Sequence, residues 1–331
     1  MIIDARAYAR AGLLGNPSDG YFGKTISLIV KNFGAQVLLY ESPELHIEPQ
    51  ESDSNTFSNI YHLRETVTQT GYNGGIPIIK AAIKKFLDHC EKHDLKISNR
   101  NFTIRYHSSI PRQVGLAGSS AIVIATLRAL IKFYGIDIEP ALLSSLALQA
   151  ETEEMGITAG LQDRVIQSFE GCVFMDFEKE NLLKTGFGKY ESLNVLQLPK
   201  LYIAYKTNLS KVSGRVLNDI KNRYEKGEQL VIDTLGRIAE IAKEGKEAIQ
   251  NQDFQKLNLL INENFDNRCK IMNISTSNME LVNTARSTGA SAKFTGSGGS
   301  IIGMYEDDEM LNKLQISLKK INARVIKPYY N

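Results

Sequence analysis

The sequence has few of the residues on which some specialised classes of protein depend. It contains only three cysteines, Cys90, Cys172 and Cys269. Because their number is odd and their spacing is wide, they form neither a disulfide framework nor a zinc-binding pattern. We therefore expect reduced thiols and a cytoplasmic protein.

Net charge and long apolar runs are lacking as well. The formal net charge over 331 residues is +2, which argues against a protein specialised for nucleic acids or membrane surfaces. No apolar run reaches the ~18 residues that span a bilayer, and the N-terminal segment MIIDARAYAR lacks the apolar core of a signal peptide. The composition, 43% hydrophobic and 23% charged, is that of an ordinary globular protein.

The length favours two domains, which we place at residues 1–195 and 196–331. In the first half, apolar periodicity and turn formers predict strands near 5–15, 26–30, 35–40, 102–107 and 172–177 and helices near 57–70, 76–90, 119–134 and 140–155. Asn32–Gly34 is a candidate hairpin turn between two of these strands. The second half predicts a strand near 198–205, then helices near 213–225, 228–250, 253–272 and 278–288, two short strands within 292–305, a last helix and a terminal strand.

The most informative segment, PRQVGLAGSSAIVIATLRAL, covers residues 111–130. Gly115 and Gly118 permit tight curvature and close approach of a ligand, and a helix should begin at or just after Ser119 because serine is a favoured N-cap. That helix is apolar on nearly every face, which predicts burial. Its N-terminus would present free N–H groups and the positive end of its dipole, which suit a phosphate. On this segment alone, a phosphate site and a serine-capped core helix remain equally good interpretations.

A second segment, QAETEEMGITAGLQDRVIQSF at 149–169, contains two acidic residues of interest. Gly156 should end one helix and Gly160 should precede another, so Glu151 and Asp163 fall on different elements. Taken alone, a glutamate in the acidic run ETEE is typical of a solvated helix face. An aspartate near a helix start is typical of a residue that interacts with the helix dipole.

Together with two further segments, these stretches resemble the motifs of the GHMP kinases, the superfamily of galactokinase and of homoserine, mevalonate and phosphomevalonate kinases. The matching segments are AYARAGLLGNPSD, PRQVGLAGSSA and KFTGSGGS, and AETEEMGITAGLQD resembles the galactokinase segment that carries a magnesium-binding glutamate and an active-site aspartate. Within the superfamily the motif sequences are most similar to those of the glucuronokinase branch, above all GNPSD where galactokinases have GEHTD.

The resemblance implies a two-domain α+β fold with the active site in the cleft between the domains. The N-terminal domain would be a mixed α/β domain that contains the glycine-loop helix, and the C-terminal domain would be ferredoxin-like. The resemblance also implies ATP and Mg²⁺ as cofactors and a sugar phosphorylated on its anomeric hydroxyl, with D-glucuronate as the first candidate. Neither nucleic acid nor membrane is expected as a partner, and the chain would be a monomer or a homodimer.

The same resemblance assigns roles to individual residues. Asp163 would act as the base for the sugar hydroxyl, and Arg10 would keep Asp163 ionised. Glu151 and Ser120 would bind Mg²⁺, with Ser119 as the alternative serine because the loop is one residue longer than in mevalonate kinases. The expected nucleotide-binding residues are Pro111, Gly115, Leu116, Ala117, Gly118, Ser119 and Ser120.

A sugar acid also requires a cationic partner for its carboxylate, best an arginine. Arg164, beside Asp163, and Arg268, in NFDNRCK, are candidates, and Lys211 is a third; each would otherwise be a surface charge. Asp19 matches the aspartate that galactokinases use on sugar hydroxyls, and Gly298 of the third motif is expected at the substrate wall of the cleft.

Three other functions stay open at this stage. The nearest is another kinase of the superfamily, of the galactose type or acting on a heptose phosphate. Diphosphomevalonate decarboxylase shares the fold, but its specific signatures are not seen in this sequence. A non-catalytic regulatory member would be expected to have lost the loop or the carboxylates, both of which this chain retains.

Overall fold

The computed structural model describes residues 2–49, 75–206 and 214–330, with the backbone alone for 214–218. Two predictions from the sequence, the helix over 57–70 and a role for Lys211, lie outside the described residues.

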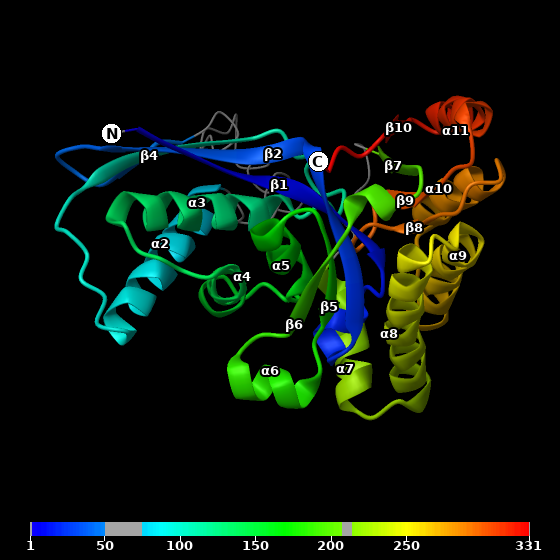
Figure 1. The fold of residues 1–331 in the computed structure, drawn as a ribbon, viewed down its shortest axis with the longest axis horizontal. Helices are drawn as coiled ribbons and strands as arrows, with labels where there is room; N and C mark the ends of the chain where they lie inside the picture. The colour runs from blue at the N-terminus through cyan, green and yellow to red at the C-terminus, as the bar shows by residue number, and fades with distance from the viewer. Residues whose placement is uncertain (1, 50–74, 207–213, 331) are drawn as a thin grey trace, which may run out of the picture.

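The N-terminal half is organised around two long antiparallel strands, β1 (Ile2–Leu14) and β2 (Lys24–Glu41) (Figure 1). One end of β2 pairs with β4 and the other end pairs with β5, so that β2 holds the sheet together. The remaining strands extend these two ends, β3 in parallel with β4 and β6 antiparallel to β5. The strands added to the long pair are β3 (His46–Ile47), β4 (Phe102–Ser108), β5 (Cys172–Asp176) and β6 (Lys189–Leu193).

Helix α3 (Gly118–Tyr134) packs under β1 and β2, and eleven of its 17 residues are buried. The predicted burial of this apolar helix is therefore confirmed. Its neighbours are α2 (Gly75–Lys92), α4 (Pro140–Gln149) and α5 (Gln162–Phe169). A π-helical turn, Ala150–Glu154, continues α4 and places Glu151 inside the molecule.

The C-terminal half contains a four-stranded sheet in the order β10-β7-β9-β8. Counted along the chain within this half, the order is 4-1-3-2 and each described neighbouring pair is antiparallel, which confirms the ferredoxin-like prediction. The strands are β7 (Leu201–Lys206), β8 (Lys293–Phe294), β9 (Ser300–Met304) and β10 (Ala323–Ile326). The helices are α7 (Gly214–Glu225), α8 (Gln229–Gln250), α9 (Phe254–Ile271), α10 (Thr276–Arg286) and α11 (Asp308–Lys320). None of the helices in the described ranges is long and apolar enough to cross a lipid bilayer.

The predicted hairpin turn at Asn32–Gly34 is wrong, because these residues lie within β2. Tyr8 of β1 pairs with Gly34 and the next residue, Ala9, pairs with Val30, so the turn-forming residues are accommodated in a bulge. The C-terminal segment supplies partners at this bulge. The Lys31 N–H donates to the Tyr329 oxygen at 2.6 Å. Asn32 donates from its side chain to the backbone oxygen of Lys327 at 3.0 Å and accepts the Tyr329 N–H at 2.7 Å.

Three elements were not anticipated: the two-residue strand β3, α6 (Lys179–Thr185) and β6. No residue of α6 is buried, and four of the five residues of β6 are not, so neither has a clear apolar pattern. The proposed boundary at 195/196 falls between β6 and β7, which belong to different sheets, and it stays a prediction. One apolar core continues across it, since Leu13 and Ile26 belong to the same cluster as Ile241 and Ile302.

The packing of α8 on the first sheet predicts opposite effects for two glycines of that helix. A Cβ at Gly245 would lie 2.0 Å from Leu14 Cδ1, whereas a Cβ at Gly236 would meet nothing within 4 Å. We expect Gly236→Ala to stabilise the protein by about 0.5–1 kcal/mol through helix propensity. Gly245→Ala should destabilise it by about 1 kcal/mol or more, because Leu14 has no room to move. Urea unfolding followed by circular dichroism measures both, and stabilisation by both substitutions would contradict this packing.

Candidate active site

A cavity of about 530 Å³ lies where the two halves of the chain meet. Its wall comes from β1, the loop after β1, the start of α3, the π-helical turn and the segment 157–164 on one side, and from α7, α9 and the loop 296–297 on the other. The residues predicted from the sequence that line it are Arg10, Asp19, Ala117, Ser119, Ser120, Glu151, Asp163, Arg164 and Arg268. The predicted residues outside the wall are Pro111, Gly115, Leu116, Gly118 and Gly298.

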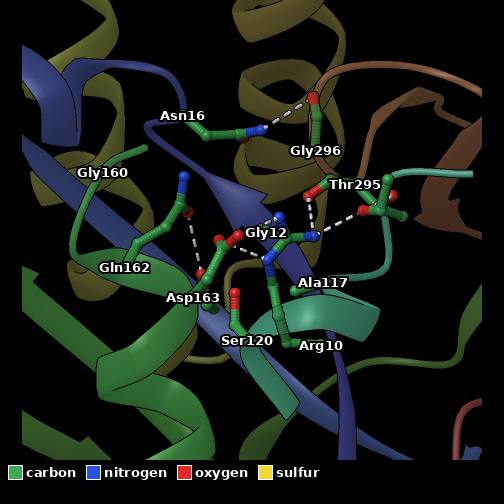
Figure 2. A network of polar contacts seen from close by, with 12 residues as sticks. Arg10, Gly12, Asn16, Ala117, Ser120, Gly160, Gln162, Asp163, Thr295 and Gly296 are labelled. Atoms are coloured by element: carbon green, nitrogen blue, oxygen red, sulfur yellow. Dashed lines mark hydrogen bonds and ion pairs between the residues drawn. The ribbon is translucent and has the colours of Figure 1, made fainter. Parts of the chain in front are cut away.

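Arg10 is the centre of the polar network at this site (Figure 2). Its Nε and Nη2 donate to the two carboxylate oxygens of Asp163, at 2.6 and 2.9 Å. Its Nη1 donates to the backbone oxygens of Gly115 and Thr295, at 2.6 and 3.1 Å. One buried guanidinium therefore connects all three glycine-containing segments with the predicted catalytic aspartate.

Asp163 stands at the start of α5 with its carboxylate directed at Arg10. Burial would by itself raise the pKa of this carboxyl, but the positive charges of Arg10 and Arg164 and the hydrogen bonds from Arg10 outweigh burial, and the pKa of Asp163 is lowered. The group is therefore ionised at neutral pH. Because 17% of its side chain is exposed, it can accept a hydrogen bond from a hydroxyl group in the cavity.

Glu151 is fully buried and occupies the centre of a second polar cluster. Ser119 Oγ and Ser120 Oγ donate to Glu151 Oε1 at 3.0 and 3.3 Å. Arg164 Nε donates to Glu151 Oε2 at 2.6 Å, and Arg164 Nη2 pairs with the same oxygen. The two serines of the glycine loop and the inward glutamate, three of the sequence candidates, are thus in direct contact.

The acidic run around Glu151 divides between two environments. Glu153 and Glu154 face outward, where Lys85 Nζ lies 2.7 and 2.9 Å from their carboxylates and Lys84 Nζ lies 3.0 Å from Glu154. The π-helical turn produces this division, since its extra residue alters the face that Glu151 presents. The solvated-face interpretation of ETEE therefore fits Glu153 and Glu154 but not Glu151.

The start of α3 differs in detail from the expected serine cap. The helix begins at Gly118, and Ala117 before it adopts a left-handed conformation (φ 58°, ψ 48°) without a side-chain cap. Neither Ser119 nor Ser120 caps the helix, because both hydroxyls donate to Glu151. The first N–H groups of any helix lack intrahelical partners, so this end of α3 offers backbone donors beside the cavity.

Gly115 and the third glycine motif pack against each other through their backbones. Gly115 has φ +73°, and a Cβ there would lie 2.6 Å from the Gly298 oxygen. A Cβ at Gly296 would lie 2.5 Å from the Gly115 oxygen. Contact between the two loops thus explains Gly115 and places Gly298 behind the cavity wall. Gly118 is different, because a Cβ there would come no closer than 3.4 Å to Ile110.

Asp19 faces Gln162 across the cavity wall. Gln162 Nε2 donates to Asp19 Oδ1 at 3.0 Å, and a Cβ at Gly160 would lie 2.0 Å from Asp19 Oδ2, so that position requires glycine. Burial, with a smaller contribution from the negative charge of Asp163, raises the pKa of Asp19 to about 6. The carboxyl can accept hydrogen bonds from substrate hydroxyls once it is ionised.

The two arginines considered for a substrate carboxylate have different surroundings. Arg164 is already paired with Glu151, so its charge is compensated within the protein. Arg268 on α9 is fully buried, donates from Nη1 to the Gly296 oxygen at 2.9 Å, and leaves its Nε without a partner. In the part of the chain that the structure describes, no carboxylate forms an ion pair with Arg268. It is the better candidate of the two.

Several residues at the site were not singled out from the sequence. Asn16 and Thr295 lie inside the quoted motifs, where attention to polar residues beside the glycines could have found them. Gln162 is adjacent to Asp163 in the same motif. Tyr21 and Tyr224, whose rings are 4.8 Å apart at the cavity wall, come from distant segments without any local signal.

Comparison with known proteins gives consistent results. The family model for the GHMP kinases N terminal domain matches residues 77–171, and that for GHMP kinases C terminal matches residues 246–320. Glucuronokinase 1 of Arabidopsis thaliana is 41% identical over 306 residues, which cover 91% of this chain and 84% of that protein. Mevalonate kinase of Pyrococcus furiosus is 25% identical and covers 90% of this chain and 87% of that protein.

A solved structure extends the similarity to the whole fold. The crystal structure of Lactococcus lactis galactokinase complexed with galactose has a TM-score of 0.77 against this chain, covering 99% of this chain and 93% of that chain. Because the sequence identity is only 13%, this likeness concerns the fold alone.

The raised pKa of Asp19 predicts a pH-dependent stability difference for Asp19→Asn. The unfolded carboxyl ionises near pH 3.8 and the folded one near pH 6, so the native protein loses stability relative to the variant as the pH rises through this window. We expect Asp19→Asn to be more stable above pH 7 by on the order of 1–3 kcal/mol, and nearly equal in stability at about pH 4. Urea unfolding at both pH values measures the difference, and equal values at the two pH values would contradict the assignment.

Proposed function

The chain belongs to the GHMP kinases, and from this membership we propose that it is a glucuronokinase, an ATP-dependent sugar kinase that phosphorylates D-glucuronate on its anomeric hydroxyl. Identity to Glucuronokinase 1 is 41% over 91% of the chain, against 25% for the mevalonate kinase, which supports this substrate over others of the family.

The observation that carries the reaction is the Arg10–Asp163 ion pair at the cavity wall, close to the start of α3. Asp163 accepts the proton of the anomeric hydroxyl while that oxygen attacks the γ-phosphorus of ATP. The bond from the γ-phosphorus to the bridging oxygen breaks, and ADP leaves with the bonding electrons. A carboxylate with a lowered pKa is a weak base, so its main contribution is to orient the hydroxyl and to take the proton late, as a loose transition state requires.

The phosphates of ATP are proposed to bind at the start of α3. Backbone N–H groups without intrahelical partners and the helix dipole both favour anions there. The left-handed conformation of Ala117 turns the chain sharply into the helix. A larger residue at position 118 is excluded neither by the backbone conformation nor by a clash, since its Cβ would come no closer than 3.4 Å to Ile110. This supports a ligand as the reason for glycine at this position.

Glu151 and the serines fit Mg²⁺ as a metal. Mg²⁺ prefers oxygen ligands and usually takes only one or two from protein, the others from phosphates and water. Glu151 Oε1, with Ser119 Oγ 3.0 Å and Ser120 Oγ 3.3 Å from it, offers such oxygens. Both hydroxyls use their hydrogen toward Glu151, which leaves oxygen lone pairs available. When bound, Mg²⁺ would supply positive charge that offsets the charge of the phosphates.

A galactose-type or heptose-phosphate kinase is the remaining candidate within the family. The same carboxylates and loop would serve it, and the difference lies in the sugar, in the group at its far end and in the configuration of its ring hydroxyls. The buried Arg268, without a carboxylate partner among the described residues, favours an anionic substrate over neutral galactose. A heptose phosphate is also an anion, so the substrate panel has to separate it from glucuronate. The retention of Arg10, Asp163 and Glu151 in one connected network argues against a non-catalytic member.

A substrate panel tests the proposed function directly. We expect ADP release from ATP to be fastest, as kcat/KM, with D-glucuronate among D-glucuronate, D-galacturonate, D-galactose, D-glucose, a heptose phosphate and mevalonate. D-Glucose, which lacks the carboxylate, should be poorer by roughly 10²–10⁴-fold, because a cation built for the acid is left unpaired. A higher kcat/KM with galactose, the heptose phosphate or mevalonate would contradict the glucuronate assignment while leaving the kinase class intact.

Asp163→Asn is the control for this assay. The amide is nearly isosteric but cannot accept the proton, so turnover should fall by about 10²–10⁴-fold while ATP still binds. Release of ADP at an unchanged rate in this variant would show that the measured activity does not come from this site.

Two glycine variants test the phosphate site. We expect Gly118→Ala to leave thermal stability unchanged but to weaken ATP binding at least about tenfold, or 1.4 kcal/mol, because the new methyl group lies at the helix start. Gly115→Ala should instead lower the melting temperature, since it combines φ +73° with a 2.6 Å contact to the Gly298 oxygen. Calorimetric titration with ATP and a thermal melt separate the two effects. Full ATP affinity in Gly118→Ala would move the phosphates elsewhere.

A further inference from the structure

Lys293 is a fully buried lysine that the proposed reaction does not use. Burial, and after it the positive charges of Arg268 and Arg10, lower its pKa, so a nearby anion would favour its charged form. Its Nζ donates to the Gly12 oxygen at 2.7 Å, to Asn16 Oδ1 at 2.5 Å and to the Phe294 oxygen at 2.8 Å. Three acceptors match the three N–H groups of an ammonium. All three are neutral, so the hydrogen bonds are satisfied while the charge is not.

Arg268 brings a second uncompensated charge to the same place. It is fully buried, its Nη1 donates to the Gly296 oxygen, and its Nε has no partner. Asp19 acts on it from a distance but forms no ion pair with it. Burying a charge without a paired opposite charge is costly, so two such cations in one region predict an anion that the free protein does not supply.

Asn16 connects these two cations with the cavity. Because Lys293 donates to Oδ1, the amide orientation is determined, and Nδ2 must face the other way. Figure 2 shows this amide directed toward Gly296, whose oxygen lies 3.5 Å from Nδ2, at the limit of a hydrogen bond. Asn16, Gly296 and Arg268 all line the cavity. Together they form what we call the basic corner, with Lys293 behind it.

The other cations of the cavity wall are compensated. Arg10 pairs with Asp163 and Arg164 pairs with Glu151. Lys221 on α7 is exposed and has Glu225 as a partner at 3.8 Å. Arg268 is therefore the cation of the wall that has no ion-pair partner among the described residues, and Asp19 acts on it only at longer range.

We propose that the carboxylate of the substrate binds at the basic corner and that Asn16 is the specificity-determining residue. Its amide presents an N–H donor to the ligand, whereas an acidic side chain at this position would repel the carboxylate. The proposal rests on the proposed function, since it takes a sugar acid as the substrate. A neutral sugar at the same place leaves Arg268 and Lys293 without a counter-charge, which weakens its binding. A sugar acid supplies that counter-charge and is also attracted directly, so the basic corner favours the acid on both grounds.

Asn16→Asp is the most direct test, because it changes charge but hardly changes shape. Its Oδ1 keeps the hydrogen bond from Lys293 and provides that lysine with a counter-charge, which offsets the loss of the weak Nδ2 contact with the Gly296 oxygen. The melting temperature should therefore stay close to that of the native protein. The ratio of kcat/KM for glucuronate to that for glucose should fall about 100-fold, mainly through KM for the acid. An unchanged ratio in a folded Asn16→Asp protein would overturn the proposal.

A substrate pair strengthens this test. D-Glucuronamide has the shape of glucuronate without its charge. The native protein should prefer the acid, and Asn16→Asp should shift this preference toward the amide. Lys221→Gln is the matched variant at another part of the cavity wall, and it should keep the native preference. Loss of the preference in Lys221→Gln, with retention in Asn16→Asp, would place the carboxylate at α7 and overturn the proposal.

Two further arms keep the outcomes distinct. If Asn16→Asp fails to fold, Arg268→Lys and Arg268→Met provide the test. The preference for the acid over the amide should survive in Arg268→Lys and be lost in Arg268→Met. The same result in both variants, whether loss or survival, would overturn the proposal. If the native protein rejects sugar acids altogether, the proposed function itself fails. If it prefers glucuronate while Asn16→Asp leaves that preference intact, only the basic corner is wrong.

Discussion

The guanidinium of Arg10 is the group on which the rest of the site depends. It holds both oxygens of Asp163 and the backbone oxygens of Gly115 and Thr295, so its donors join segments 105 to 285 residues away in the chain. The planar fork of arginine suits this task, because it can bind a carboxylate with two parallel hydrogen bonds while a third nitrogen serves other acceptors. A lysine would offer a single nitrogen. The carboxylate of Asp163, which we propose as catalytic, and the two glycine loops are therefore held by the same side chain.

Pairing of charges then determines what the cavity can select. Arg10 compensates Asp163, and Arg164 compensates Glu151, so the residues proposed for the chemistry contribute little net charge to the cavity. Arg268 and Lys293, the basic residues of this region without a carboxylate partner among the described residues, lie in the second half of the chain, and burial lowers the pKa of both. The proposed catalytic carboxylates lie in the first half. Catalysis and recognition of the substrate carboxylate can thus be changed separately, which suits a fold whose members act on different substrates.

The sequence predicted most of the fold because its signals were local. The apolar run after Ser120, the two glycines between Glu151 and Asp163 and the long periodic helices of the second half each mark an element by themselves. The hairpin at Asn32–Gly34 was wrong because a turn-forming triplet can equally sit in a bulge, and only the pairing of β2 with β1 and the C-terminal segment decides between them. The polar helix α6 carries no buried residue and hence no pattern to detect.

The site was predicted less completely, for a physical reason that the glycines illustrate. Gly115, Gly118 and Gly160 read alike in the sequence, yet one avoids the Gly298 oxygen, one would make only an ordinary contact with Ile110 and one avoids the carboxylate of Asp19. For Gly115 and Gly160 the reason lies in a segment distant along the chain. The same holds for Asn16, since its amide orientation follows from a hydrogen bond to Lys293, 277 residues away. Motifs identify which residues gather at a site, but the charge that each presents to a ligand depends on which neighbours have already satisfied it.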